Sequence, residues 1–159
     1  MLFRSTFDPL VFTPDSQLAS SIVWFDALVC NVDRTVRNVN MLIWHRRLWL
    51  IDHGASLYFH HAWSSRDVPA ANPFALIKDH VLLKYAGALA EADDRMAPLI
   101  TEDKVASIVE LIPDSWLVED PGFACRDGQR RAYWDFFTQR LQSSAVFVQE
   151  AIRARSSHL

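Results

Sequence analysis

The sequence predicts an α+β fold that is mainly helical and carries one β-hairpin. Apolar residues recur at helical spacing in several segments, and two short apolar runs flank a polar turn near the middle of the chain. No internal repeat is present. The chain has 159 residues and is 50% hydrophobic. This is enough for one sizeable core and too little for two stable ones, so we expect a single domain over residues 1–159.

The first helix is expected over roughly residues 14–30. Thr13 is a suitable N-cap, and Pro14 fits the first helical position, where a missing N–H is harmless. The preceding residues 1–12 should be irregular or form one short strand, because prolines interrupt any helical period there. The apolar stripe of the helix is Leu18, Ile22, Phe25 and Val29.

Residues 31–40 are expected to form an ordered loop that leads into a hairpin. The segment carries three asparagines and no helical stripe, which suits a loop whose side chains bond to its own backbone. Residues 41–44 and 48–51 are apolar runs of strand length, joined by a polar turn at 45–47. Asp52 then ends the second strand.

Helices should make up most of the remaining chain, after an irregular stretch at 55–71. Asn72 and Pro73 predict the start of a helix that ends before Gly87, and residues 88–97 add a turn of helix. Thr101 predicts the start of a helix that Pro113 stops. Its apolar face is Val105, Ile108, Val109 and Ile112.

Asp127 is predicted to cap one long last helix, which frays after residue 153. Its apolar side should pack into the core of the domain. That side consists of Tyr133, Phe136, Phe137, Leu141, Ala145 and Val148. The arginines of this helix, Arg140 among them, are expected on a solvated face rather than in a nucleic-acid patch.

Composition excludes several classes of protein. A net charge of −3 and 22% charged residues give no basic surface for nucleic acid. The two cysteines form neither a disulfide framework nor a zinc spacing, which favours a reducing cytoplasm. No apolar run reaches the length of a membrane span, and no secretory signal begins the chain, so we expect no membrane partner.

Three oxygen-bearing side chains could converge around the loop and the hairpin. Asp33 and Asn38 lie five residues apart in the loop, and the hairpin brings Asp52 back at the end of its second strand. Phosphoryl transfer needs a carboxylate to orient the accepting hydroxyl and hard oxygen ligands to hold magnesium against the phosphates. The spacing therefore suggests a phosphotransferase.

The same residues resemble the HipA-like kinases. Asn31-Val-Asp-Arg-Thr-Val-Arg-Asn38 is similar to the Asn-x-Asp-x-His-x-x-Asn loop of that family, and Leu-Ile-Asp52-His-Gly stands where kinases place Asp-Phe-Gly. The phosphatidylinositol kinases share a more distantly related loop. The stretch from residue 24 to residue 61 carries the resemblance most clearly.

The resemblance implies a protein-kinase-like carboxy-terminal lobe that uses ATP and Mg²⁺, with a protein serine or threonine as acceptor. By this resemblance Asp33 is the catalytic carboxylate, and Asn31, Asn38 and Asp52 form the cofactor site. Asn38 and Asp52 would hold magnesium, while Asn31 would brace the loop. Asn40 is expected to brace the loop as well, rather than to bind metal.

Two residues depart from the family pattern. Thr35 replaces the usual histidine, which puts the support of the loop in question, and His53 replaces a phenylalanine, which alters a packing contact. In addition, only 32 residues precede Asp33, with no lysine and no glycine among them. We therefore expect the amino-terminal ATP-binding lobe to be absent or supplied by another chain.

The alternative is a degenerate or truncated lobe that acts as a non-catalytic protein-binding module. Two other types of site are disfavoured. The spacing of His45, His53, His60 and His61 fits no zinc site, and none of the serines has the glycine-flanked turn of a hydrolase nucleophile.

Overall fold

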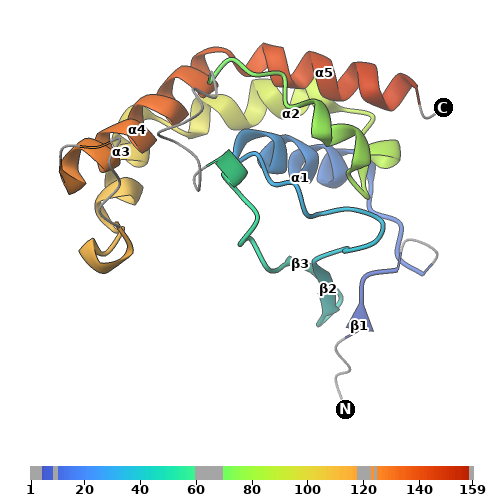
Figure 1. Cartoon of the computed structure of the whole chain (residues 1–159). Coiled ribbons are helices and arrows are strands. Elements are labelled where there is room, and N and C mark those ends of the chain that lie inside the picture. The colour runs from blue at the N-terminus through green and yellow to red at the C-terminus, as the bar shows by residue number, and fades with distance from the viewer. Residues whose placement is uncertain (1–4, 9–10, 60–69, 118–122, 124, 158–159) are drawn as a thin grey trace.

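The protein is mainly helical, with a small antiparallel sheet at one end (Figure 1). The computed structural model describes residues 5–8, 11–59, 70–117, 123 and 125–157. Helices line the top of the molecule in Figure 1, and the sheet lies below them, next to the amino terminus. The predicted α+β class with one hairpin is confirmed. Within the described residues, no helix combines the length and the hydropathy needed to cross a membrane.

Helix α1 (Ser16–Leu28) lies at the centre of the fold. Its N-cap is Asp15 rather than the predicted Thr13, because the Oδ1 atom of Asp15 accepts a hydrogen bond from the backbone N–H of Leu18 at 2.8 Å. The buried surface of α1 is wider than the predicted stripe, since helices α2 (Leu89–Met96) and α5 (Ser144–Ser156) both pack against it. Leu18, expected on that stripe, is 37% exposed.

The sheet has three antiparallel strands in the order β1 (Ser5–Thr6), β2 (Met41–Trp44) and β3 (Arg47–Leu50). The short first strand and the hairpin are as predicted, except that Arg47 belongs to the second strand of the hairpin. His45 and Arg46 form a two-residue turn with φ values of 50° and 60°. Positive φ at both positions matches the right-handed twist of the flanking strands.

The predicted helix between Asn72 and Gly87 is wrong. Two short 3-10 helices occupy this segment, η2 (Ala75–Asp79) and η3 (Leu83–Tyr85). Asn72 Oδ1 accepts a hydrogen bond from the N–H of Phe74 at 2.7 Å, and Phe74 has a left-handed φ of 56°. His80 is extended, which interrupts the helical path a second time. The prediction of helix at 88–97 is confirmed by α2 and the 3-10 turn η4 (Ala97–Leu99).

Helix α3 (Glu102–Glu110) is as predicted, with Thr101 as its N-cap. The Thr101 hydroxyl accepts a hydrogen bond from the N–H of Lys104 at 3.3 Å. Val105 and Val109 are buried against helix α4 (Arg126–Gln142), whereas Ile108 is 63% exposed. The turn η5 (Asp114–Trp116) follows after Pro113.

The predicted long last helix is two helices, α4 and α5, which follow each other along the top of the molecule (Figure 1). Ser143 separates them, with a φ of −112° and a hydroxyl that donates to the carbonyl of Gln139. The N-cap of α4 is Cys125, not Asp127. Helix α5 extends to Ser156, so the chain does not fray after residue 153. On the predicted apolar side Phe136 is buried, but Ala145 is exposed.

Arg140 is fully buried, which corrects the prediction that it lies on a solvated face. Its guanidinium donates hydrogen bonds to the carbonyl groups of Ala27 and Leu28 at the end of α1, and to those of Ala70 and Asn72. The last carbonyls of a helix lack partners within it and carry partial negative charge, so a buried cation is favoured there. Arg140 thereby ties α4 to the point where the loop 31–40 begins.

Candidate active site

The carboxylate of Asp33 is held by two asparagine amides. Nδ2 of Asn38 donates to Oδ2 of Asp33 at 2.7 Å, and Nδ2 of Asn40 donates to the same oxygen at 3.2 Å and to the Asp33 carbonyl at 3.1 Å. Because both amides bind Oδ2, Oδ1 is the oxygen that Asp33 can offer to a substrate. Asn40 therefore braces the loop, as the sequence suggested.

Asn31 supports the loop from below and is only 3% exposed. Its Oδ1 atom accepts a hydrogen bond from the backbone N–H of Asp33 at 3.1 Å, and its Nδ2 atom donates to Oδ1 of Asp26 at 3.0 Å. Both polar ends of the side chain are thus bonded within the protein. These contacts fit the bracing role that the resemblance implied for Asn31.

Thr35 closes the turn of the loop. Its N–H donates to the carbonyl of Asn38 at 2.9 Å, and its hydroxyl accepts from the N–H of Asn38 at 3.2 Å. The kinases that the loop resembles usually have a histidine at this position. In this protein the threonine supplies local support of its own, and it positions the Asn38 backbone directly.

A buried cluster of charged and polar side chains anchors the loop to α1. Asp26 accepts hydrogen bonds from Nε of Arg34 at 2.5 Å and from Nη2 of Arg34 at 3.3 Å. Nε2 of His80 lies 2.9 Å from Oδ2 of Asp26. Burial alone raises the pKa of Asp26, but the hydrogen bonds from His80 and Arg34 and the positive charge of Arg34 outweigh it, so that the pKa lies below its usual value.

The hydrogen bonds of His80 fix its tautomer. The backbone N–H of Leu82 donates to Nδ1 of His80 at 3.0 Å, so Nδ1 is an acceptor and Nε2 carries the proton that is donated to Asp26. Two backbone contacts join the same segment to the loop: Val81 donates to the Arg34 carbonyl at 3.0 Å, and Thr35 pairs with His80 in an isolated β-bridge.

Arg34 also connects the loop to the strand that precedes Asp52. Its Nη1 atom donates to the carbonyl of Asn40 and, at 3.5 Å, to that of Ile51. The N–H of Ile51 donates to the Asn40 carbonyl at 3.0 Å. Asn40, which binds Asp33 through its side chain, is therefore joined to the residue before Asp52 through its backbone.

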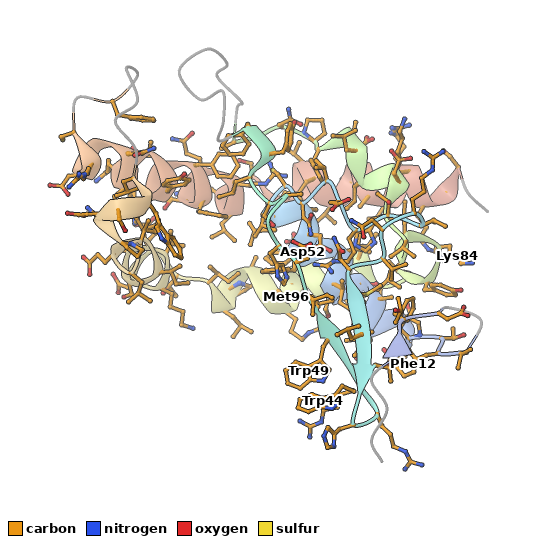
Figure 2. The ribbon with its side chains drawn as sticks, turned by 60° about the horizontal axis from the view of Figure 1, so that its bottom comes forward. Phe12, Trp44, Trp49, Asp52, Lys84 and Met96 are labelled. Carbon is orange, nitrogen blue, oxygen red and sulfur yellow. The ribbon has the colours of Figure 1, made fainter. Side chains whose placement is uncertain are left out.

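Asp52 leaves the end of β3 in a left-handed conformation, with a φ of 49°, and its side chain is exposed. Figure 2 shows it above the base of the hairpin, away from the tip where Trp44 and Trp49 project. A Cβ atom at Gly54 would lie 3.4 Å from Oδ1 of Asp52. Because Gly54 has no side chain, the space beside the Asp52 carboxylate stays open.

Asn38 and Asp52 fit a magnesium ion by the chemistry of their atoms. Nδ2 of Asn38 is engaged with Asp33, so the amide oxygen is the atom that Asn38 can offer to a cation. Amide and carboxylate oxygens suit Mg²⁺, which takes few protein ligands and completes its shell with water and phosphate. In the part of the chain that the structure describes, no group of three or more His, Cys, Asp and Glu side chains could hold a metal ion.

The histidines considered in the sequence do not gather into one site among the described residues. The His53 ring packs edge-on against Phe25, with centroids 6.1 Å apart, and His45 packs against Trp44 in the hairpin turn. His60 and His61 lie outside the described residues. His53 therefore still makes a packing contact in place of the usual phenylalanine.

Sequence reasoning missed Asp26, Arg34 and His80 as parts of the site. A weak signal existed for Asp26, a carboxylate in an otherwise apolar helix shortly before the loop, because such a group needs a buried partner. Arg34 lies inside the loop motif. His80 is 54 residues from Asp26, and nothing local in the sequence indicates that pairing.

The family model for HipA-like kinases matches residues 11–145. The matched stretch contains α1, the loop, the hairpin and Asp52. The chain belongs to the HipA-like kinase family. The family is one of kinases, which are phosphotransferases, in agreement with the resemblance seen in the loop. Comparison of this HipA-like kinase with curated proteins and with solved structures gave no match.

Proposed function

We propose that this HipA-like kinase is a kinase-like carboxy-terminal lobe that transfers the γ-phosphoryl group of ATP, with Mg²⁺, to a serine or threonine hydroxyl of a protein. The observation that carries the proposal is the Asn38 amide on the Asp33 carboxylate at 2.7 Å, in a loop anchored by a buried ion pair. Such a loop holds its carboxylate in one position before any substrate binds, which is what catalysis by positioning requires.

Asp33 orients the accepting hydroxyl. Its Oδ2 atom is bonded to Asn38 and Asn40, so its Oδ1 atom accepts the hydroxyl hydrogen and points the oxygen at the phosphorus. Asn31 and the Asn40 amide keep the Asp33 backbone from turning. The hydroxyl proton passes to Asp33 as the new oxygen–phosphorus bond forms and the bond to ADP breaks.

Asn38 and Asp52 are the residues that would hold magnesium. When bound, Mg²⁺ neutralises charge on the phosphate oxygens and aligns them for transfer. Asn38 would contribute its amide oxygen, and Asp52 its exposed carboxylate. The backbone bond between Ile51 and Asn40 keeps the two contributing segments in register.

Labelled ATP tests the proposal. The full chain is incubated with Mg²⁺, ATP labelled at the γ position and a library of serine- and threonine-containing peptides, and phosphate transfer to the peptides and to the chain itself is counted. We expect transfer by the wild type and a loss of about 100-fold or more in Asp33→Asn, since an asparagine cannot accept the proton. Asp94→Asn, which changes an exposed carboxylate on α2, is the matched control.

Equal transfer by Asp33→Asn and wild type would contradict the assignment of Asp33. Absence of transfer by the wild type, together with absence of Mg²⁺-dependent ATP binding, would contradict the proposed activity. Circular dichroism of each variant shows that the fold is retained.

A further inference from the structure

A cavity of about 670 Å³ lies beside the loop that carries Asp33. One wall is the loop itself, with Thr35 and Arg37, which stand between the proposed catalytic Asp33 and Asn38. The other wall is the segment of η2 and η3, with Lys78 and Lys84. We call this space the basic cavity. Its volume is in the range of sites that bind small molecules or peptide side chains.

The walls of the basic cavity are joined to each other. Val81 on one wall donates a hydrogen bond to the Arg34 carbonyl at the start of the other, and Thr35 pairs with His80. His80 in turn is bonded to Asp26 below the loop. The two walls of the cavity are therefore tied to each other, and anything bound in it contacts the same loop that positions Asp33.

Positive charge predominates in the basic cavity. Arg37, Lys78 and Lys84 are exposed cationic residues of its lining, opposed by the single carboxylate of Asp79. His80 adds no charge, because its Nδ1 atom accepts a backbone N–H. A concave surface of one sign attracts and orients groups of the opposite sign, and guanidinium and ammonium groups pair readily with carboxylate and phosphate.

We propose that the basic cavity binds an acidic segment of the acceptor protein, with a carboxylate or phosphate side chain close to the serine or threonine that is phosphorylated. This inference rests on the proposed function, because it assigns the cavity to the acceptor of that reaction. An anion held between Arg37 and Lys84 lies against the loop, which brings a neighbouring hydroxyl towards Asp33. The site thus selects acidic acceptors.

Peptide binding without nucleotide tests this selectivity. Fluorescence anisotropy compares two short peptides that contain one serine, flanked by glutamates in one and by glutamines in the other. We expect the full chain to bind the glutamate peptide about fivefold to tenfold more tightly at low salt, because exposed ion pairs are each worth only a few-fold in affinity. The preference should shrink as salt is added.

Two double variants with the same change of charge identify the site. Arg37→Gln with Lys84→Gln removes one cation from each wall and should abolish the preference. Arg46→Gln with Arg47→Gln removes two cations from the hairpin and should leave it unchanged. Equal binding of both peptides by the wild type, or an equal loss in both double variants, would overturn the proposal.

Nucleotide binding, measured separately by calorimetry with Mg²⁺ and ATP, distinguishes this inference from the proposed function. If wild-type chain transfers phosphate but shows no preference for the glutamate peptide, the basic cavity is wrongly assigned and the kinase activity stands. If it prefers the glutamate peptide but neither binds ATP nor transfers phosphate, the proposed function fails, and with it the assignment of the cavity to a phosphate acceptor.

Discussion

Asp26 and Arg34 form an ion pair in which neither side chain is exposed, with 2.5 Å between Oδ2 and Nε. Asp26 belongs to helix α1, and Arg34 follows Asp33 in the loop. Removing two charges from water costs free energy that the pair recovers only with good geometry and further hydrogen bonds. Here Asn31 and His80 bind Asp26, and the carbonyls of Asn40 and Ile51 bind Arg34. The pair therefore fixes the loop more than it adds net stability.

Loss of the Asp26 charge should strongly destabilise the protein. In Asp26→Asn the Arg34 guanidinium stays buried without a counter-charge, so we expect the free energy of unfolding to fall by about 3 kcal/mol. Urea denaturation followed by circular dichroism measures this. Asp94→Asn, the exposed control on α2, should change the free energy by less than about 0.5 kcal/mol. Similar values for both variants would show that the buried pair does not anchor the loop.

The stability of the protein should fall in acid because of Asp26. Its pKa in the folded state lies below the ordinary value of 3.8, so the unfolded chain takes up the proton first as the pH falls. The contribution of ionised Asp26 to the free energy of unfolding is complete at a pH above its pKa in the unfolded chain. It is lost as the pH falls through its lower pKa in the folded protein. Urea midpoints measured between neutral pH and about pH 3 should decline less steeply in Asp26→Asn than in the wild type. Identical slopes would contradict the shift.

Arg140 should matter more for stability than the exposed Arg131 of the same helix. Arg140→Gln leaves several of the four bonded carbonyls without a donor, and we expect a loss of about 2–4 kcal/mol. Arg131→Gln on the same helix removes an exposed pair with Asp135 and should cost under about 1 kcal/mol. Thermal denaturation of the two variants makes the comparison, and a larger loss in Arg131→Gln would refute the role of Arg140.

The two cysteines should differ in reactivity. Cys30 is buried, and burial raises the pKa of its thiol to about 11, although the positive charge of Arg140 opposes this, whereas Cys125 is exposed. The thiolate is the reactive form, so an aromatic disulfide reagent at neutral pH should modify Cys125 quickly and Cys30 only after denaturation. Cys125→Ser should abolish the fast phase. A fast phase that persists in this variant would mean that Cys30 is accessible in the folded protein.

Local signals in the sequence predicted most elements. The apolar stripe located α1, the Thr101 cap and the apolar face located α3, and two apolar runs around a polar turn located the hairpin, because each of these signals depends on residues close together in the chain. The prediction of a helix between Asn72 and Gly87 was wrong, because Phe74 takes a left-handed conformation and the extended His80 bonds to Asp26. The break at Ser143 was also missed, because neither glycine nor proline marks it.

The sequence indicated the loop residues of the candidate site, with Asn31 and Asn40 as braces, but it did not indicate the buried residues that anchor the loop. Asp33, Asn38 and Asp52 form a short motif that a spacing rule can recognise. Arg140 and His80 contact residues far away in the chain, and an arginine on a helix gives no sign in sequence that it turns inward to bind carbonyls. Hydrogen bonds to residues distant in the chain determine where the side chains of Arg140 and His80 lie.

Binding of Mn²⁺, a spectroscopic substitute for Mg²⁺, tests most directly whether Asn38 and Asp52 share one ion with ATP. Electron paramagnetic resonance of the full chain, titrated with Mn²⁺ and a non-hydrolysable ATP analogue, reports the bound ion. We expect a bound signal in the wild type and in Asp94→Asn, and a loss of affinity of at least about tenfold in Asp52→Asn and Asn38→Ala. Unchanged binding in those two variants, or no bound ion in the wild type, would contradict the proposed site.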